Sequence, residues 1–462
     1  MNKIFVLPFA TFLYFFNTTS LLSQNPEKPN LVFILADDCT NWDIGCFGND
    51  QSKTPNIDKL AEEGLKFNRC YQAASMSSPT RHNIFTGLYP VKTGAYPNHT
   101  KAYENTKSIV HYLKPLGYRV ALSGKRHIAP IKVFPFEYLD KSSNPDFDLV
   151  DEFLKTVKES GESFALMLCS NEPHDPWDKG DISLFNQETI TLPPNCIDTK
   201  ATREAYCRYL AEINYLDAQV GEALKLIEKY EFKENTLIVF ASEQGNIFPF
   251  NKWTLYEAGV KSALIARMPG LIKPGSETDA IVEYSDLLPT FIDIAGGSIP
   301  ENIDGKSLVP IFKNPNNKIK EYSFSIQTTR GIVNGSDYYG IRAIVSDRYR
   351  YIWNLTPEAE FLNLINNSEK DESSKWDIKW YESWQEKAKN NFSAQNIIFK
   401  YRKRPKEELY DIVNDKWCLI NLAEDPNYMH IKSVLRTELL KWMDECGDEG
   451  QETELRAFDR ML

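Results

Sequence analysis

Two adjacent carboxylates, Asp37 and Asp38, follow directly on the apolar run 30–36. A continuous apolar run of this length is typical of a strand covered on both faces, and open α/β sheets bind their ligands beyond the carboxyl ends of such strands. Neighbouring like charges repel unless a cation lies between them. The pair therefore favours a cation site lined by oxygen atoms, whereas an isolated Asp-Asp is more often an ordinary turn or helix cap.

A second segment, Ser77-Ser-Pro-Thr-Arg-His-Asn-Ile-Phe-Thr-Gly87, combines a hydroxyl group with a predicted helix start. The proline is typical of the first turn of a helix and the glycine of its end, so we expect Ser77 just before the helix N-terminus. The free amides and the positive dipole there attract an anion. A plain helix with a glycine cap is the simpler alternative.

The pattern Ser77-x-Pro-Thr-Arg81, followed by Thr86-Gly87, resembles the signature of the sulfatase family, and the resemblance extends over most of the chain. In that family the leading Cys or Ser is oxidised to the aldehyde formylglycine by a formylglycine-generating maturation enzyme. The hydrate of this aldehyde offers one hydroxyl to attack sulfur and a second to expel the resulting sulfate. The resemblance therefore implies that Ser77 becomes the reacting group.

The same resemblance implies two further catalytic segments. The family's Gly-Lys-x-His element appears as Gly124-Lys-Arg-His127, and its Pro-His-x-Pro element as Pro173-His-Asp-Pro176, so that two of only six histidines lie in these motifs. His127 would exchange a proton with the hydrate, and His174 or Lys252 would protonate or steady the leaving group. The implied catalytic side chains are Ser77, Arg81, Lys125, His127, His174 and Lys252.

By the same resemblance, the Asp pair would bind one calcium ion. The family's second metal motif, Ser-Asp followed by Asn or His and Gly, stands here as Ser242-Glu-Gln-Gly245, in which both ligands are one methylene longer. They remain hard oxygen donors, which calcium prefers. The implied calcium ligands are Asp37, Asp38, the modified Ser77, Glu243 and Gln244.

The segments 124–136 and 245–250 are similar to those of the heparan N-sulfatase (N-sulfoglucosamine sulfohydrolase) group. This likeness implies a sulfated carbohydrate as substrate, a glycosaminoglycan sugar and in particular N-sulfoglucosamine. Two alternatives stay open, an O-sulfatase acting on another sulfated glycan and an inactive homologue that only binds glycans. A two-zinc phosphatase or phosphodiesterase of the same fold would need additional Asp and His ligands.

The elements that must position these residues alternate along the chain. Strand-like runs lie at 118–122, 164–169, 236–241 and 263–267, and helical patterns at 54–64, 146–159 and 201–230. This alternation predicts an α/β fold, a doubly wound and mostly parallel sheet with helices on both faces. The resemblance implies that this sheet is alkaline-phosphatase-like.

A chain of 462 residues is too long for one ordinary hydrophobic core. We predict a catalytic α/β domain over 24–320 and a smaller C-terminal α+β domain over 321–462. In the latter, strand-like pieces at 342–355 and 409–412 flank a polar stretch at 366–389. The final helix is predicted over 430–445, with its apolar stripe formed by Ile431, Val434, Leu439, Leu440 and Met443.

Residues 1–23 have the pattern of a cleaved signal peptide, with a basic start and an apolar run too short to anchor the chain. We therefore expect an exported protein, periplasmic or secreted, with no membrane span after cleavage. The net charge of −11 argues against nucleic acid as a partner, so an anionic substrate needs a local cluster of cations. The eight cysteines form no Cys-x-x-Cys pair, which argues against structural zinc; disulfides and buried thiols are equally compatible with the sequence.

Overall fold

The computed structural model describes residues 28–367 and 378–462, so the predicted signal peptide lies outside the described residues. Within these two segments no helix is both long enough and apolar enough to cross a membrane. All eight cysteines lie in the described part of the chain and none forms a disulfide, so there the structure has free thiols, most of them buried.

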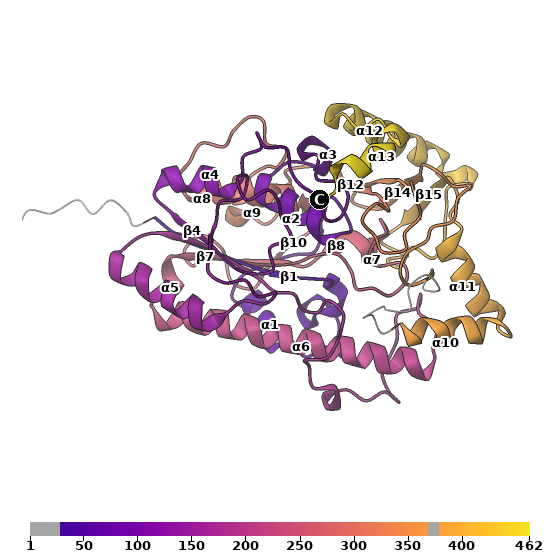
Figure 1. The fold of residues 1–462 in the computed structure, drawn as a ribbon, viewed down its shortest axis with the longest axis horizontal. Coiled ribbons are helices and arrows are strands. Elements are labelled where there is room, and N and C mark those ends of the chain that lie inside the picture. Colours follow the sequence, from indigo (N-terminus) through magenta and orange to yellow (C-terminus); the bar gives the residue numbers. More distant parts are fainter. Residues whose placement is uncertain (1–27, 368–377) are drawn as a thin grey trace, which may run out of the picture.

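An eight-stranded sheet forms the centre of the molecule (Figure 1), in the order β10-β2-β9-β7-β1-β6-β4-β5. The run β7-β1-β6-β4-β5 is parallel, whereas β9 is antiparallel to β7 and β2 to β9. The predicted α/β class with a mostly parallel sheet is confirmed. The bounds are β1 Asn30–Ala36, β2 Leu65–Phe67, β4 Arg119–Gly124, β5 Glu137–Tyr138, β6 Phe164–Cys169, β7 Thr236–Ser242, β9 Leu264–Arg267 and β10 Ser276–Thr278.

Helices cover both faces of this sheet, which is why β1 is buried along its whole length. Val32 and Ile34 of β1 join the core beneath α1 (Pro55–Glu62), α5 (Phe147–Ser160) and α6 (Lys200–Lys229). Alternate β1 residues, among them Phe33, pack against the opposite layer. That layer contains α2 (Ser77–Thr86), α4 (Ile109–Leu113), α8 (Leu287–Ile294) and α9 (Val309–Lys313).

An apolar stripe of the long helix α6 faces the core: Leu210, Ile213, Leu216 and Val220 are all buried. The side chain of Thr199 caps its first turn by accepting a hydrogen bond from the Thr202 amide. Shorter elements complete this part of the molecule: α3 (Pro90–Thr93), α7 (Glu257–Val260) and a small sheet of β3 (Cys70–Tyr71), β8 (Lys261–Ser262) and β11 (Val282–Glu283).

A four-stranded antiparallel sheet follows, made of β12 (Ser323–Gln327), β13 (Ile341–Val345), β14 (Tyr349–Asn354) and β15 (Glu407–Asp411). The strand-like piece at 342–355 is thus a pair of antiparallel strands. The helices α10 (Lys379–Ala388), α11 (Phe392–Arg402), α12 (Met429–Cys446) and α13 (Gln451–Leu455) accompany it. The predicted domain boundary at 320–321 lies just before β12 and stays a prediction.

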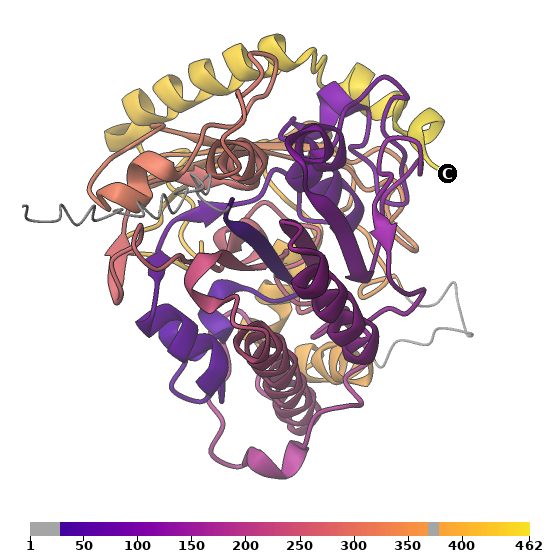
Figure 2. The ribbon, with the colours of Figure 1, turned by 90° about the vertical axis from the view of Figure 1, so that its left-hand side faces the viewer.

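The helix α12 lies where it was predicted, and Leu439 and Met443 of the predicted apolar stripe are buried, but two other residues of the stripe are not. It packs on β13 and β14, on the side of the molecule away from α5 and α6 (Figure 2). Val434 and Leu440 are exposed at 40% and 42%, whereas Leu435 and Trp442 are buried. The Trp442 ring stacks on Phe324 at 5.1 Å, and this large contact sets the rotation of the helix. A further helix, α13, follows it.

Candidate active site

Four neighbouring parallel strands bring the predicted site residues to one edge of the sheet. Asp37 follows β1, Lys125 follows β4, His174 follows β6 by a short loop, and Gln244 follows β7. Backbone hydrogen bonds join these strand ends, from the Glu243 amide to the Ala36 carbonyl at 3.0 Å and from the Lys125 amide to Cys169 at 2.8 Å. The site lies where ligands of open α/β sheets bind.

The Ser77 hydroxyl lies among the groups that follow β1 and β7. It donates a hydrogen bond of 2.8 Å to Oδ1 of Asp37 and accepts one of 2.8 Å from the Gln244 amide nitrogen. That nitrogen also donates to Oδ1 of Asp38 at 2.8 Å. The helix α2 begins at Ser77 itself, one residue earlier than predicted, with Met76 as its N-cap. Ser77 is therefore part of the first turn, where backbone amides are free.

Positive side chains surround the two aspartates. Lys125 contacts Oδ2 of Asp37, and Lys252 donates to Oδ2 of Asp38 at 2.6 Å. The nearest guanidinium nitrogen of Arg81 lies 3.8 Å from Asp37. Burial opposes ionisation of Asp37, but Lys125, His174 and Arg81 together hold its pKa well below the usual value. The buried carboxylate is therefore ionised.

Glu243 and Gln244 face different partners. The Glu243 carboxylate lies 2.6 Å from Nε of Arg81, and both side chains are fully buried. Burial raises the pKa of Glu243 well above its usual value, although the Arg81 charge opposes this. Arg81 also donates to the Lys125 carbonyl at 2.7 Å. Gln244 alone of this pair hydrogen-bonds both aspartates.

Several polar atoms of this centre are buried without a hydrogen-bond or ion-pair partner, including Oε2 of Glu243 and Oε1 of Gln244. The oxygen and nitrogen of an amide exchange places by a half-turn about the last side-chain bond. After that turn the Gln244 oxygen would meet oxygens of Asp37, Asp38 and Ser77, which requires a cation among them. The donor set thus fits a hard cation such as calcium. In the described segments no three His, Cys, Asp or Glu side chains form a ready metal site, so the amide and hydroxyl are needed.

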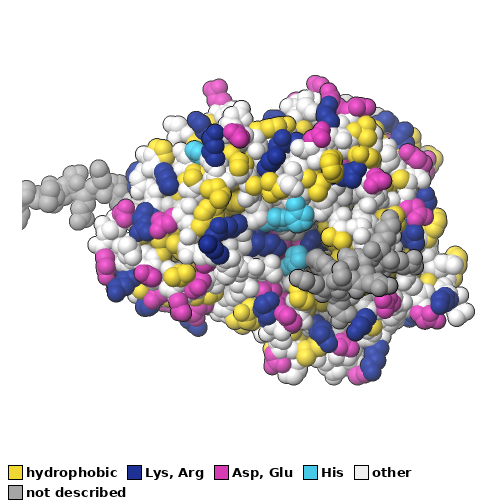
Figure 3. Space-filling view, viewed as in Figure 1, with side chains coloured by type: hydrophobic (Ala, Val, Ile, Leu, Met, Phe, Trp, Pro, Cys, Tyr) yellow, Lys and Arg dark blue, Asp and Glu magenta, His cyan; other side chains and the backbone are white. Residues whose placement is uncertain are grey.

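Histidine side chains border a hollow on the face seen in Figure 3, with basic side chains within it. Nε2 of His127 lies 3.1 Å from Nδ1 of His99, a residue that no motif indicated. Burial and the Lys125 charge lower the pKa of His127 well below its usual value, so its ring is neutral. His127 and His99 have positive φ angles, 48° and 50°, a conformation that is rare for histidine. The loop that carries His99 follows no strand, so sequence offered no signal for it.

His174 completes the ring of side chains. Its Nε2 atom lies 3.6 Å from Oδ2 of Asp38, and its Nδ1 atom lies 2.6 Å from the Asp175 carbonyl. Burial and the charge of Lys252 lower the pKa of His174 to about 4, so the neutral ring can act as a base or, through Nδ1–H, as a donor to the carbonyl. Every predicted catalytic side chain thus lies at this edge of the sheet.

Comparisons with known proteins show which family the chain resembles. A family model described as Sulfatase matches residues 29–298, and one described as N-sulphoglucosamine sulphohydrolase, C-terminal, matches 245–365. An ulvan-active sulfatase of Formosa agariphila is 34% identical, over 91% of this chain and 81% of that protein. The human N-sulphoglucosamine sulphohydrolase is 23% identical, over 91% of this chain and 90% of that protein.

The fold is shared with a solved structure of a protein in complex with its substrate D-glucosamine-2-N,6-O-disulfate, at a TM-score of 0.68 and 19% identity. This match covers 92% of this chain and 99% of that chain. The Sulfatase model spans more than half of the present sequence. On the family match and the 34% identical relative, this chain belongs to the sulfatase family, whose members are sulfuric ester hydrolases.

Proposed function

We propose that this sulfatase removes sulfate from a sulfated carbohydrate and that Ser77, converted to formylglycine, is its reacting group. The observation that carries the proposal is the position of the Ser77 hydroxyl, held at 2.8 Å by Asp37 and by Gln244 in the first turn of α2. Carbohydrate as the substrate class is supported by two relatives, one described as ulvan-active and the other as N-sulphoglucosamine sulphohydrolase.

The cations around Ser77 account for binding of a sulfate group. The chain as a whole carries a net charge of −11 and repels anions, so the attraction must be local. Lys125, Lys252 and Arg81 contribute three fixed positive charges within reach of the two aspartates. Buried donors of this kind stabilise the negative charge that develops on sulfate oxygens.

Proton transfer is assigned to the two neutral histidines. His127 would exchange a proton with a hydroxyl at Ser77, because burial keeps its ring uncharged. His174 or Lys252, which both lie next to Oδ2 of Asp38, would protonate or steady the leaving group. In this assignment His127 follows β4, whereas His174 follows β6 and Lys252 lies in the loop after β7.

Calcium and the aldehyde are the cofactors of the proposal. When bound, calcium supplies positive charge that polarises the sulfate oxygens. Asp37, Asp38, Gln244 and the modified Ser77 would hold it, with Glu243 close by. The partner of the protein would be a formylglycine-generating maturation enzyme, and the site of action outside the cytoplasm follows from the predicted signal peptide at 1–23.

Two sugars compete as the substrate. The C-terminal family match over 245–365 favours glucosamine N-sulfate, since it begins at the segment that also resembles the N-sulfatase group. The greater identity to the ulvan-active sulfatase, 34% against 23%, favours an O-sulfated glycan instead. We place N-sulfoglucosamine first because the match falls on residues that flank Gln244 and Lys252.

The test is to compare kcat/KM for N-sulfated, 6-O-sulfated and 3-O-sulfated glucosamine and for ulvan oligosaccharides. A pocket that pairs with an N-linked sulfate should prefer it by about 100-fold, because an O-linked isomer leaves a buried polar group unpaired. Faster cleavage of an O-sulfated sugar would refute the assignment to N-sulfate but would still agree with a carbohydrate sulfatase. If protein with modified Ser77 released sulfate from none of these sugars, hydrolysis would be refuted. The alternative of an inactive homologue that only binds glycans would then stand.

A further inference from the structure

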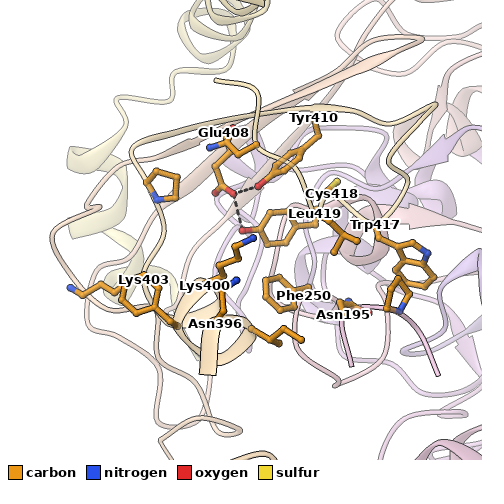
Figure 4. A pocket seen from close by; sticks show the side chains of 16 residues that line it. Asn195, Phe250, Asn396, Lys400, Lys403, Glu408, Tyr410, Trp417, Cys418 and Leu419 are labelled. Carbon is orange, nitrogen blue, oxygen red and sulfur yellow. Dashed lines mark hydrogen bonds between the residues drawn. The ribbon is translucent and has the colours of Figure 1, made fainter. Parts of the chain in front are cut away.

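A second cavity, of about 300 Å³, shares no lining residue with the predicted site. It lies between α11, β15 and the loops that carry Asn195 and Trp417 (Figure 4). Small-molecule sites begin at roughly this size, about 300 Å³. Its wall also contains Phe250, from the loop that connects Gln244 to Lys252, so one short segment borders both the cavity and the reaction centre.

Aromatic rings form the walls of this cavity. Phe250 and Trp417 are half-buried, while Tyr256 and Tyr410 are buried and both donate to the same oxygen of Glu408, at 2.9 Å and 2.5 Å. These two bonds, drawn in Figure 4, hold the phenol rings in place. Fixed, amphipathic rings give contact area at low entropy cost, which suits the apolar face of a sugar ring.

Asn195 supplies an unsatisfied acceptor. Its side chain is only 2% exposed, and its amide nitrogen donates to the Pro249 carbonyl at 3.2 Å, which fixes the orientation of the group. The amide oxygen has no hydrogen-bond partner. A buried acceptor without a donor is costly, so this atom calls for a ligand that carries hydroxyl or N–H groups.

Lys400 supplies a positive charge. It is exposed on the last turns of α11 and makes no ion pair within the described part of the chain. In Figure 4 its side chain extends along the cavity, whereas Lys403 is directed away from it and donates to the Glu358 carbonyl at 2.9 Å. The cavity thus combines an unpaired lysine, an amide oxygen without a hydrogen-bond donor, and aromatic walls. This combination fits a ligand that is both hydroxylated and anionic.

We propose that this cavity is a second carbohydrate site, which binds a sulfated sugar residue with its ring on Phe250 and Trp417, a hydroxyl on Asn195 and its sulfate near Lys400. The choice of a sulfated sugar, rather than another hydroxylated anion, rests on the proposed function. The site would hold the glycan at a place separate from Ser77 and would raise the affinity for chains over that for single sugars.

The experiment is isothermal titration calorimetry of a heparin-derived disaccharide that carries N- and O-sulfates, with the Ser77→Ala protein so that no turnover occurs. Two sites per chain are expected. Lys400→Glu and Asn195→Ala should each weaken the second site by about 10-fold or more and leave the first unchanged. Lys441→Glu, the same charge change on the exposed face of α12, is the matched control and should keep both sites.

Unsulfated cellobiose should bind the cavity about 10-fold more weakly than the sulfated disaccharide, because it lacks the partner of Lys400. Equal binding of both disaccharides, or an unchanged affinity of the second site in both cavity variants, would overturn the proposal. So would a change of sedimentation coefficient in those variants without loss of sugar binding, since the cavity would then be a protein interface. Sulfate release by the wild-type protein is measured separately. Absence of sulfate release would refute the proposed function. Even then, weaker sugar binding at the second site in the two cavity variants would support this inference.

Discussion

Two buried charge clusters in this molecule, one with two carboxylates and one with three, differ in how well their polar atoms are paired. In the first, Glu283 and Asp286 share Lys320, whose ammonium group lies 2.6 Å and 2.8 Å from them. Every carboxylate oxygen there has a partner: Glu283 accepts from the Tyr89 hydroxyl and the Phe324 amide, and Asp286 from Lys320 and backbone amides. This cluster holds β11 to the start of β12.

In the second cluster, around Asp37 and Asp38, several atoms are left without a hydrogen bond. These include Oε2 of Glu243, Oε1 of Gln244 and Nδ1 of His127. Unsatisfied buried groups lower stability, and folds keep them chiefly where a ligand will pair with them. The contrast indicates that the Lys320 cluster serves the fold and the Asp37 cluster serves chemistry, and it can be tested by changing one cluster at a time.

The largest effect is expected from Ser77→Ala. Sulfate release should fall by at least about 10⁴-fold, because the group that reacts is gone. Folding should hardly change, with Tm within about 2 °C of wild type, because one small side chain is removed. Ser78→Ala, at the next position of α2, is the matched control and should keep activity. Near-normal release by purified Ser77→Ala would exclude Ser77 as the nucleophile.

The second-largest effect on sulfate release is expected from removal of the metal. Chelation of calcium should abolish sulfate release and also lower Tm, since a ligand that binds only the folded state stabilises it. Calcium, but not zinc, should restore both, because the donors are carboxylate, amide and hydroxyl oxygens and zinc prefers nitrogen or sulfur. Elemental analysis that found stoichiometric zinc and no calcium would favour the phosphatase alternative instead.

A matched pair of lysine changes separates the two clusters. Lys320→Met should lower the free energy of unfolding by about 3–5 kcal/mol, because it leaves two buried carboxylates without their cation. The folded fraction should keep kcat within about twofold. Lys125→Met should do the reverse, with activity lost and stability less affected, since Arg81 and Lys252 still lie near the aspartates. Chemical denaturation and kinetics on both variants measure this. Equal effects of the two changes would remove the distinction between the clusters.

The smallest effect is expected from His99→Ala. The His99 ring contacts Nε2 of His127 at 3.1 Å and would fix its tautomer and orientation without touching the substrate. We expect kcat to fall about 10-fold with KM unchanged, and His99→Gln, which keeps a hydrogen-bonding group, to recover part of it. A rise in KM alone would mean that His99 binds the substrate rather than positions His127.

Sequence could predict the parts of the site that follow a buried strand and those that lie in the motif 77–87. Asp37 after β1 and Lys125 after β4 are examples, because the strand end fixes the place of the next residues in space. His99 could not be found in this way, since only the folded loop brings it to His127. The buried face of α12 was predicted only in part: Leu439 and Met443 are buried, but Val434 and Leu440, which fit the helical period equally well, are exposed. The stacking of Trp442 on Phe324 favours the observed rotation of the helix.

The direction of the strands shows a similar limit. The alternation of strands and helices predicts parallel pairing, and it holds for β1, β4, β6 and β7. Between β7 and β9, a segment that the structure describes in full, the only helix is the four-residue α7, and β9 returns antiparallel to β7. Parallel neighbours need a longer crossover, usually a helix of several turns. Where such a helix is absent, sequence periodicity locates a strand but does not predict whether it pairs parallel or antiparallel.

The central claim, that Ser77 is converted to an aldehyde, is tested most directly by the mass of the tryptic peptide 70–81, which ends at Arg81 and follows Arg69. In active protein made together with a formylglycine-generating enzyme, this peptide should be lighter by two hydrogens than its sequence mass, and the extent of conversion should track sulfate release across preparations. Full sulfatase activity in a preparation that contains only the unmodified serine peptide would contradict the account.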